Sequence, residues 1–218
     1  MIRVTLDSNC VFVLDEKDPK TAFVQQFVRQ LVNLHKQRKI EIQIPLMLAY
    51  ENRLGERHGI PLDKYKDNWR NLERELQQKI KTHGFDPLYL HRLAIMPEPE
   101  LYPGSNLFPA GKDTIALFEE IRDIVHPEID FDRMLEEAQK KDPEVVFAPD
   151  WKSAYIDILI CLSHIISKAD ILVSNDEDIY GKAKELERCG ARTVLSCSAQ
   201  DQKRFDEFLK KTSRKIKK

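Results

Sequence analysis

The chain has 218 residues, of which 42% are hydrophobic and 33% charged, enough for one packed domain that carries an insertion. Its 7 glycines and 8% aromatic content argue against a β-sandwich or a low-complexity protein. The net charge of −1 provides no overall attraction for nucleic acid, so any such partner must be held by a local basic surface.

The first strand and helix are marked by their apolar patterns. Residues 2–6 predict a short strand that ends at Asp7, and residues 21–38 predict an amphipathic helix. The expected apolar stripe of this helix consists of Phe23, Val24, Phe27, Val28, Leu31 and Leu34. The alternation in IEIQI then predicts a second strand over residues 40–44.

A helix is expected after this second strand. Pro45 is well placed to be an early residue of the segment LMLAYENRLGERH, which Gly59 should end. Residues 62–83 form a longer amphipathic pattern that stops at Gly84. The proline-rich stretch 85–111 predicts an extended connection with little regular structure.

The rest of the chain returns to alternating helices and strands. Two short helices are expected over residues 114–125 and 131–140, and a strongly apolar helix over 151–168. The remaining expected elements are a strand over 171–173, a helix over 177–189 closed by Gly190, a strand over 192–195 and a helix over 199–210. A basic tail, 211–218, follows.

This order of elements predicts an α/β fold with a central, mostly parallel sheet flanked by helices on both faces. Residues 1–210 are expected to form a single domain, interrupted by a helical and irregular insertion at about 60–150.

The sequence also indicates a cellular setting. No stretch approaches the roughly 18 apolar residues that span a bilayer, and the start of the chain lacks a secretory pattern. The cysteines form no CxxC pair and have no histidine partner at zinc-finger spacing, which predicts buried free thiols. We therefore expect a cytoplasmic protein with no membrane contact.

Acidic residues recur where strands of a parallel sheet end, which is where ligand sites form in such sheets. Asp7 and Asp176 follow expected strands, Glu51 lies in the helix after the second strand, and Asp157 lies in an apolar helix. A buried, unpaired carboxylate costs several kcal/mol, so Asp157 requires a cation, a hydrogen-bond donor or water. All four side chains could reach one edge of the sheet.

Each acidic residue also has a simpler interpretation when it is taken alone. Asp157, His164 and Lys168 could form the solvated stripe of an amphipathic helix. Asp7 could be a turn or capping residue, and Glu51 an ordinary helix glutamate. The run 175–178 could be a helix N-terminus. Only the joint placement of the acids at the ends of consecutive elements points to a site.

The chain resembles the PIN-domain nucleases in four segments. VTLDSN is similar to the family's opening strand, and IPLMLAYE to its second motif. YIDILICLSHIISKADILVSNDEDI looks like the combined third and fourth motifs, and TVLSCSAQDQKRFDEFL like the closing strand and helix. The resemblance covers roughly residues 1–58 and 150–210. The middle of the chain is much longer than in the compact toxins of this family, and Ser174 stands where threonine is commoner.

The resemblance implies a nuclease site in which Asp7, Glu51, Asp157 and Asp176 hold a divalent metal. Asn9 and Ser174 would orient carboxylates or water, and Asp178 would join the cluster or cap the next helix. Acids without histidine or cysteine suit Mg²⁺ or Mn²⁺. The implied reaction is hydrolysis of RNA that leaves a 5′-phosphate and a 3′-hydroxyl.

RNA phosphates would need basic neighbours. The candidates are Arg53, Arg57, Lys152, Lys210, Lys211, Arg214, Lys215, Lys217 and Lys218. The basic tail could equally be a solvated end of the chain. Trp69 and Tyr65 could stack on bases, but their position on an apolar stripe favours core packing.

Other functions remain open at this point. The chain could be the toxin of a toxin–antitoxin pair, with an antitoxin protein covering the acids, or a non-catalytic module that binds RNA or protein. A homodimer is also possible. A phosphatase that uses Asp7 as nucleophile would need a second aspartate at position 9, where this chain has Asn9. Nucleotide-binding glycine loops do not occur in the sequence.

Overall fold

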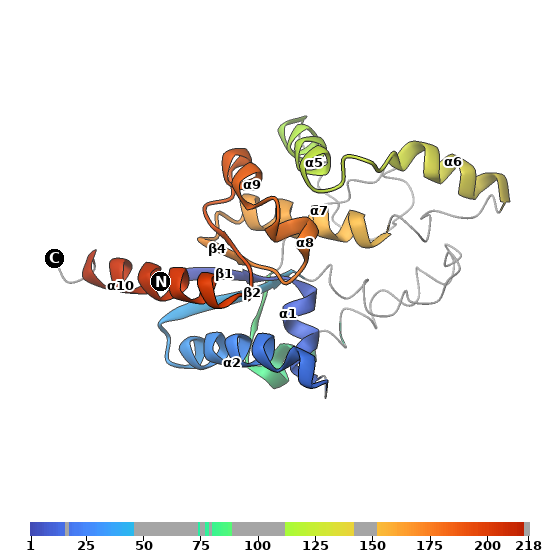
Figure 1. Cartoon of the computed structure of the whole chain (residues 1–218). Helices are drawn as coiled ribbons and strands as arrows, with labels where there is room; N and C mark the ends of the chain where they lie inside the picture. Colours follow the sequence, from blue (N-terminus) through green and yellow to red (C-terminus); the bar gives the residue numbers. More distant parts are fainter. Residues whose placement is uncertain are drawn as a thin grey trace.

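The computed structural model describes residues 1–15, 18–45, 74, 77–78, 80–88, 112–141 and 152–215 (Figure 1). Its strands are β1 (Ile2–Leu6), β2 (Ile40–Pro45), β3 (Asp86–Leu88), β4 (Ile171–Val173) and β5 (Val194–Leu195). Its α-helices are α1 (Ser8–Phe12), α2 (Ala22–Lys36), α5 (Lys112–Val125), α6 (Phe131–Lys141), α7 (Lys152–Ile166), α8 (Glu177–Tyr180), α9 (Ala183–Cys189) and α10 (Ala199–Lys215). Two short 3₁₀ helices, Val13–Asp15 and Pro19–Thr21, connect α1 to α2.

The five strands form one sheet in the order β3-β2-β1-β4-β5, and every pairing between them is parallel. In the central pairing Val4 of β1 lies opposite Ile42 of β2 on one side and Ile171 of β4 on the other. These three residues are fully buried, as expected for a parallel sheet covered on both faces. The predicted α/β architecture with a parallel sheet is confirmed.

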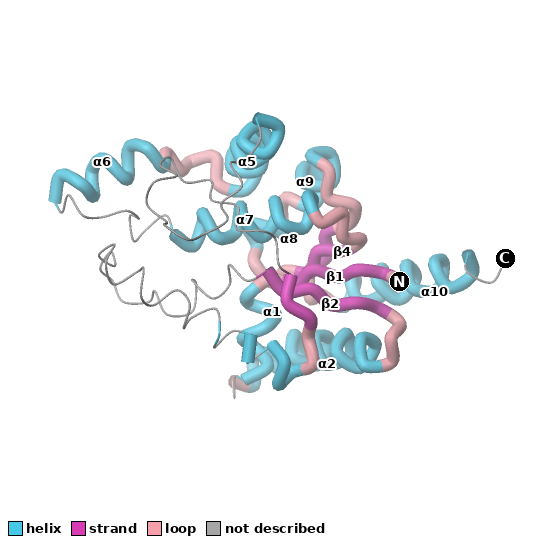
Figure 2. Tube along the Cα trace, turned by 180° about the vertical axis from the view of Figure 1, so that it is seen from behind, coloured by secondary structure: helices cyan, strands magenta, loops and turns pink. Residues whose placement is uncertain are grey.

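Helices cover both faces of the sheet (Figures 1 and 2). Helix α2 lies on one face, where Phe27 packs edge-on against Phe205 of α10 with ring centroids 5.8 Å apart. Helices α5, α7 and α9 lie on the opposite face. Helix α7 is in direct contact with the sheet there, since His164 Nδ1 is 3.1 Å from Oγ1 of Thr5 in β1.

Helix α2 buries a slightly different stripe from the one predicted. Phe27, Val28, Leu31 and Val32 are its buried residues, whereas Phe23 is 45% exposed. The predicted amphipathic helix is confirmed, but its buried face includes Val32 and leaves out Phe23. Val24 and Leu34, which also belong to the predicted stripe, are partly buried against the core.

The structure corrects the prediction for Pro45. This residue is the last of β2 and lies opposite Leu88 of β3, so it belongs to a strand and not to the next helix. Proline is tolerated at a strand end, where its missing N–H removes little of the ladder. Strand β3 itself was not predicted, because three residues that include Pro87 carry no readable periodicity.

Two further corrections concern the C-terminal third. The helix predicted over 177–189 is interrupted after Tyr180, giving the separate helices α8 and α9. A side chain at Gly181 would place a Cβ 2.5 Å from the carbonyl oxygen of Glu177, so the break accepts only glycine without a shift of the backbone. Helix α10 also runs to Lys215, so the first part of the predicted basic tail is helical.

Helix α5 of the predicted insertion packs onto the scaffold. Helices α5 and α6 occur where the sequence predicted them. Phe118 and Ile121 of α5 are buried, and the Phe118 ring lies 5.5 Å from that of Tyr155 in α7. Gly84, with φ of +81°, ends the predicted long helix, of which residues 74, 77–78 and 80–83 are described. The helix expected over 46–58 lies outside the described residues.

Three of the cysteines, Cys10, Cys161 and Cys197, are buried, Cys189 is half-buried, and all four are free thiols, as predicted. Among the helices that the structure describes, none is long and apolar enough to cross a membrane.

Candidate functional site

Asp7 lies at the carboxyl end of β1, the central strand of the sheet. Its backbone N–H donates to the carbonyl of Val173 at 3.0 Å, which joins the ends of β1 and β4. The same residue caps the N-terminus of α1, where its carboxylate accepts from the backbone N–H of Ser8. The capping role anticipated for Asp7 is therefore real, but it accounts for only part of the side chain's contacts.

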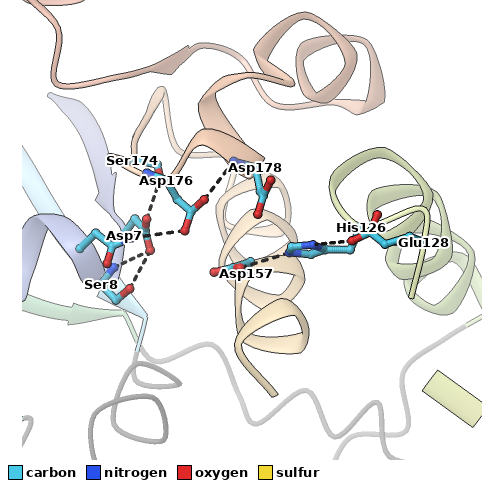
Figure 3. Close-up of polar contacts among 9 residues, drawn as sticks. Asp7, Ser8, His126, Glu128, Asp157, Ser174, Asp176 and Asp178 are labelled. Atoms are coloured by element: carbon cyan, nitrogen blue, oxygen red, sulfur yellow. Dashed lines mark hydrogen bonds and ion pairs between the residues drawn. The ribbon is translucent and has the colours of Figure 1, made fainter. Parts of the chain in front are cut away.

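The carboxyl group of Asp7 is fully buried and surrounded by hydroxyl and amide donors (Figure 3). Ser174 donates its hydroxyl to Oδ2 at 2.6 Å, and the Ser8 hydroxyl donates to Oδ1 at 3.1 Å. Burial raises the pKa of Asp7 and the negative charge of Asp176 adds to it, while the hydrogen bonds from Ser174 and Ser8 act against the rise. Neutral donors thus stabilise this carboxylate only in part.

Asp176 follows the end of β4 and caps helix α8. Its Oδ1 accepts from the backbone N–H of Asp178 at 2.9 Å, and its own N–H donates to the Ser174 hydroxyl at 2.9 Å. Asn9 donates from its side-chain amide to Oδ2 of Asp176 in a long contact of 3.4 Å. Ser174 is therefore bonded to both Asp7 and Asp176, and Asn9 touches the second of them.

Asp157 extends from α7 toward these two residues (Figure 3). It is 7% exposed, and burial raises its pKa to about 6, with a further contribution from the charges of Asp7 and Asp176. His164, on the same helix, is also buried. The alternative in which Asp157 and His164 belong to a solvated helical stripe is therefore wrong.

His126 is a site residue that the sequence did not indicate. Its Nε2 lies 3.2 Å from Oδ2 of Asp157, and its Nδ1 lies 3.6 Å from a carboxylate oxygen of Glu128. Burial by itself lowers the pKa of His126, but the contact with Asp157 and the charges of Asp178 and Glu128 outweigh it and raise the pKa above 6.5. The contact with Asp157 therefore favours the protonated form of the imidazole.

The local sequence explains why His126 leaves the helix at this point. Helix α5 ends at Val125, because Pro127 disfavours helical backbone in the residue before it. The N–H of His126 still donates to the carbonyl of Arg122 at 2.8 Å, and its own carbonyl accepts from Ile129 at 3.1 Å. The only signal in the sequence was this His-Pro pair at a helix end, which carries no chemical information.

The structure therefore brings together Asp7, Asp157 and Asp176, with Ser174, Asn9 and Asp178 around them. Glu51, the fourth predicted acid, lies outside the described residues. Among the basic candidates, Lys210 and Lys211 are exposed on α10. The side chains of Arg53, Arg57, Lys152, Arg214, Lys215, Lys217 and Lys218, and the aromatic residues Trp69 and Tyr65, also lie outside what the structure describes.

The donor set consists of carboxylate, hydroxyl and amide oxygens, which suits Mg²⁺ or Mn²⁺ better than zinc. Within the described part of the chain, no lysine or arginine is ion-paired with Asp7, Asp157 or Asp176, and the described ion pairs give only Asp157 a basic partner, His126. Within the same part, no three His, Cys, Asp or Glu side chains are grouped closely enough to hold a metal ion between them.

Asp7 and Asp157 are buried and Asp176 is half-buried, and all three lie at the carboxyl edge of the parallel sheet, where ligand sites form in such folds. Carboxylates are the kind of ligand through which a divalent cation would activate water or polarise a phosphate. Comparison with protein-family models, with curated proteins and with solved structures found no match to this chain.

Proposed function

We propose that this chain is a divalent-metal-dependent nuclease that hydrolyses phosphodiester bonds in RNA. The observation that carries the proposal is the convergence of Asp7, Asp157 and Asp176 from three separate elements. Asp7 and Ser174 are 167 positions apart in sequence, yet a 2.6 Å hydrogen bond joins them. Local capping would not require a third carboxylate, buried on α7, to lie within the electrostatic influence of the other two.

Electrostatics supports a cation as the missing partner. The pKa values of Asp7 and Asp157 are raised first by burial and then by neighbouring negative charge, so both carboxylates are destabilised in their ionised form. A bound divalent cation would reverse that effect, because it neutralises like charges that burial has brought together. His126 contacts only Asp157 of the three acids, so Asp7 and Asp176 have no comparable basic partner among the described ion pairs.

Asp7, Asp157 and Asp176 would hold the metal, with Glu51 as the fourth ligand implied by the PIN resemblance. Mg²⁺ or Mn²⁺ bound there supplies polarisation of a phosphoryl oxygen and activation of water. The Ser174 hydroxyl donates to Oδ2 of Asp7 and accepts from the backbone N–H of Asp176. It would thereby hold these two acidic residues at a fixed position relative to each other. Asn9 restrains Oδ2 of Asp176 in the same way, through a longer contact.

The order of the PIN-like motifs in the sequence supports RNA as the substrate and 5′-phosphate and 3′-hydroxyl ends as the products. We also propose a reducing, cytoplasmic setting for the protein, which is supported by the four free cysteines.

The proposal is tested with purified wild-type protein and the variants Asp7→Asn, Glu51→Gln and Asp157→Asn. Each is incubated with end-labelled single-stranded RNA of mixed sequence in Mg²⁺, Mn²⁺ or EDTA. We expect cleavage that requires metal and falls at least ~100-fold in each variant, since losing a ligand should cost more than losing one of its supporting partners. The chemistry of the product ends is read by phosphatase and ligase treatment.

Asp123→Asn is the matched control, because Asp123 is an exposed aspartate of α5 whose side chain bonds only its neighbour Arg122 among the described contacts. It should cleave like the wild type. Cleavage that survives EDTA, or that persists in Asp7→Asn and Asp157→Asn, would refute the metal-dependent mechanism. Metal binding without cleavage of any RNA tested would instead identify a non-catalytic module.

A further inference from the structure

We propose that His126, contributed by the inserted region, is a positioning residue of the acidic site and fixes the carboxyl group of Asp157 for metal binding. This inference rests on the proposed metal site and adds to it a side chain outside the acidic motifs. It assigns a role to the insertion, because His126 follows α5 and belongs to neither PIN-like segment of the sequence.

The contact has the geometry of a positioning interaction. Nε2 of His126 lies 3.2 Å from Oδ2 of Asp157, and the two residues are 6% and 7% exposed. Figure 3 shows the carboxyl of Asp157 between the imidazole on one side and Asp7 and Asp176 on the other. The imidazole therefore contacts Oδ2 of Asp157 on the side away from Asp7 and Asp176.

His126 is itself restrained through its backbone and through its ring. Its backbone is bonded to Arg122 and Ile129 at the end of α5, and its Nδ1 faces Glu128 at 3.6 Å. Helix α5 is anchored on α7 by buried Phe118 and Ile121, and the Phe118 ring lies against Tyr155, two positions from Asp157. The same helix pair thus carries both partners of the contact, which limits their relative movement.

Positioning matters here because the alternatives for Asp157 are unfavourable. Its side chain is buried and is repelled by the charges of Asp7 and Asp176, so a carboxylate without a partner would be driven away from the other two acids. Groups that hydrogen-bond a metal ligand from outside the coordination sphere typically change metal affinity or activity by 10- to 100-fold. A purely structural role would instead make His126 a polar link between α5 and α7.

Two amide substitutions of His126 separate these roles, because their side chains carry the same amide group and differ in length by one methylene. In His126→Gln the amide nitrogen can occupy the place of Nε2, whereas in His126→Asn it reaches only as far as Nδ1. Phe118→Leu is the packing control, since it loosens α5 on α7 and leaves His126 in place. Mn²⁺ binding is measured by calorimetry, unfolding by urea titration, and RNA cleavage as kcat and KM.

We expect His126→Asn to weaken Mn²⁺ binding about 10-fold and His126→Gln to stay within about 3-fold of the wild type. Cleavage by His126→Asn should lose kcat with little change in KM, because no RNA contact is removed. Phe118→Leu should lower the free energy of unfolding and leave Mn²⁺ affinity unchanged. Glu128→Gln, which alters only the exposed partner, should change Mn²⁺ affinity less than His126→Asn.

The inference fails by itself if the wild type binds Mn²⁺ and cleaves RNA while His126→Asn does both equally well. It also fails if Phe118→Leu weakens Mn²⁺ binding as much as His126→Asn does, since packing alone would then explain the effect. A wild-type protein that binds no Mn²⁺ would refute the proposed metal site and the role of His126 together, so the two failures are distinguishable.

Discussion

The hydroxyl of Ser174 donates a 2.6 Å hydrogen bond to Oδ2 of Asp7, and through it the residue after β4 is tied to the residue after β1. Both side chains are fully buried. The Ser174 oxygen also accepts the backbone N–H of Asp176 at 2.9 Å. One hydroxyl therefore positions two of the three converging acids, so its removal should disturb the site as well as the fold.

We predict that Ser174→Ala lowers the free energy of unfolding by about 1–3 kcal/mol, because it removes the hydroxyl that donates to Oδ2 of the buried Asp7 carboxylate. Ser174→Thr retains the hydroxyl and should recover most of this loss. Urea unfolding of both variants in EDTA measures the difference.

Ser167→Ala serves as the control. Ser167 donates to the backbone carbonyl of His164 at the C-terminal end of α7, so its replacement should lower the free energy of unfolding less than Ser174→Ala does. Equal stability of Ser174→Ala and the wild type would show that the bond to Asp7 contributes nothing to the fold.

The pKa of Asp157, raised to about 6 by burial, predicts how stability depends on pH in the metal-free protein. Between pH 3.8 and about 6 the folded chain keeps a proton on Asp157 that the unfolded chain has lost. This contribution is complete below pH 3.8 and disappears as the pH rises through 6. At 1.36 kcal/mol for each pKa unit, the gap corresponds to on the order of 3 kcal/mol.

His126 acts in the same direction at higher pH, because its pKa is raised above 6.5 and its contribution is lost as the pH rises past that value. Asp157→Asn should therefore be more stable than the wild type at pH 7.5 in EDTA and should lose less stability between pH 4 and 7.5. Urea titrations at pH 4, 6 and 7.5 measure this. Parallel pH profiles for the two proteins would contradict the prediction.

His164 should produce the opposite pH dependence. Burial lowers the pKa of His164 to about 4, and the positive charge of Arg192 contributes while Asp170 opposes it. The neutral imidazole, 3.1 Å from the Thr5 hydroxyl, stabilises the fold above pH 6.5 and the contribution is lost as the pH falls toward 4. The size is again on the order of 3 kcal/mol.

His164→Gln removes this titration, so its stability should fall less steeply than that of the wild type between pH 6.5 and 4. Because Asp157 and His164 act oppositely over this range, the measurement is the difference between variant and wild-type urea curves. An unchanged slope in His164→Gln would show that the histidine does not titrate on unfolding.

Phe27 and Phe23 give a paired test of the packing of α2. Phe27 is fully buried against Phe205, whereas Phe23 is 45% exposed four positions earlier. We predict that Phe27→Ala costs about 3–5 kcal/mol of unfolding free energy. Phe23→Ala should cost less than about 1 kcal/mol. Similar losses in the two variants would place Phe23 in the core and contradict the structure.

The sequence was sufficient for the parts of the fold that repeat locally. Strands β1, β2 and β4 and helices α2, α5, α6 and α7 each carry enough residues to show their periodicity. Once those strands were expected to be parallel, the rule that parallel strands end at one edge placed Asp7 and Asp176 near each other. Ser174 and Asn9 were suggested only by the resemblance to the PIN-domain nucleases.

Features that depend on a partner distant in the chain were missed. Strand β3 is defined by pairing with β2, and its three residues have no pattern of their own. The exposure of Phe23 depends on which side of α2 the rest of the fold covers. No single-residue propensity reports such constraints.

His126 shows the same limit at the site. It is 31 positions from Asp157, and their contact exists because α5 packs against α7 and ends at the turn before Pro127. The sequence by itself determined which carboxylates follow which strands, since that follows from local periodicity. Only the tertiary structure decided which of them are buried and what lies behind Asp157, since burial and hydrogen bonding depend on helices packing together across the sheet.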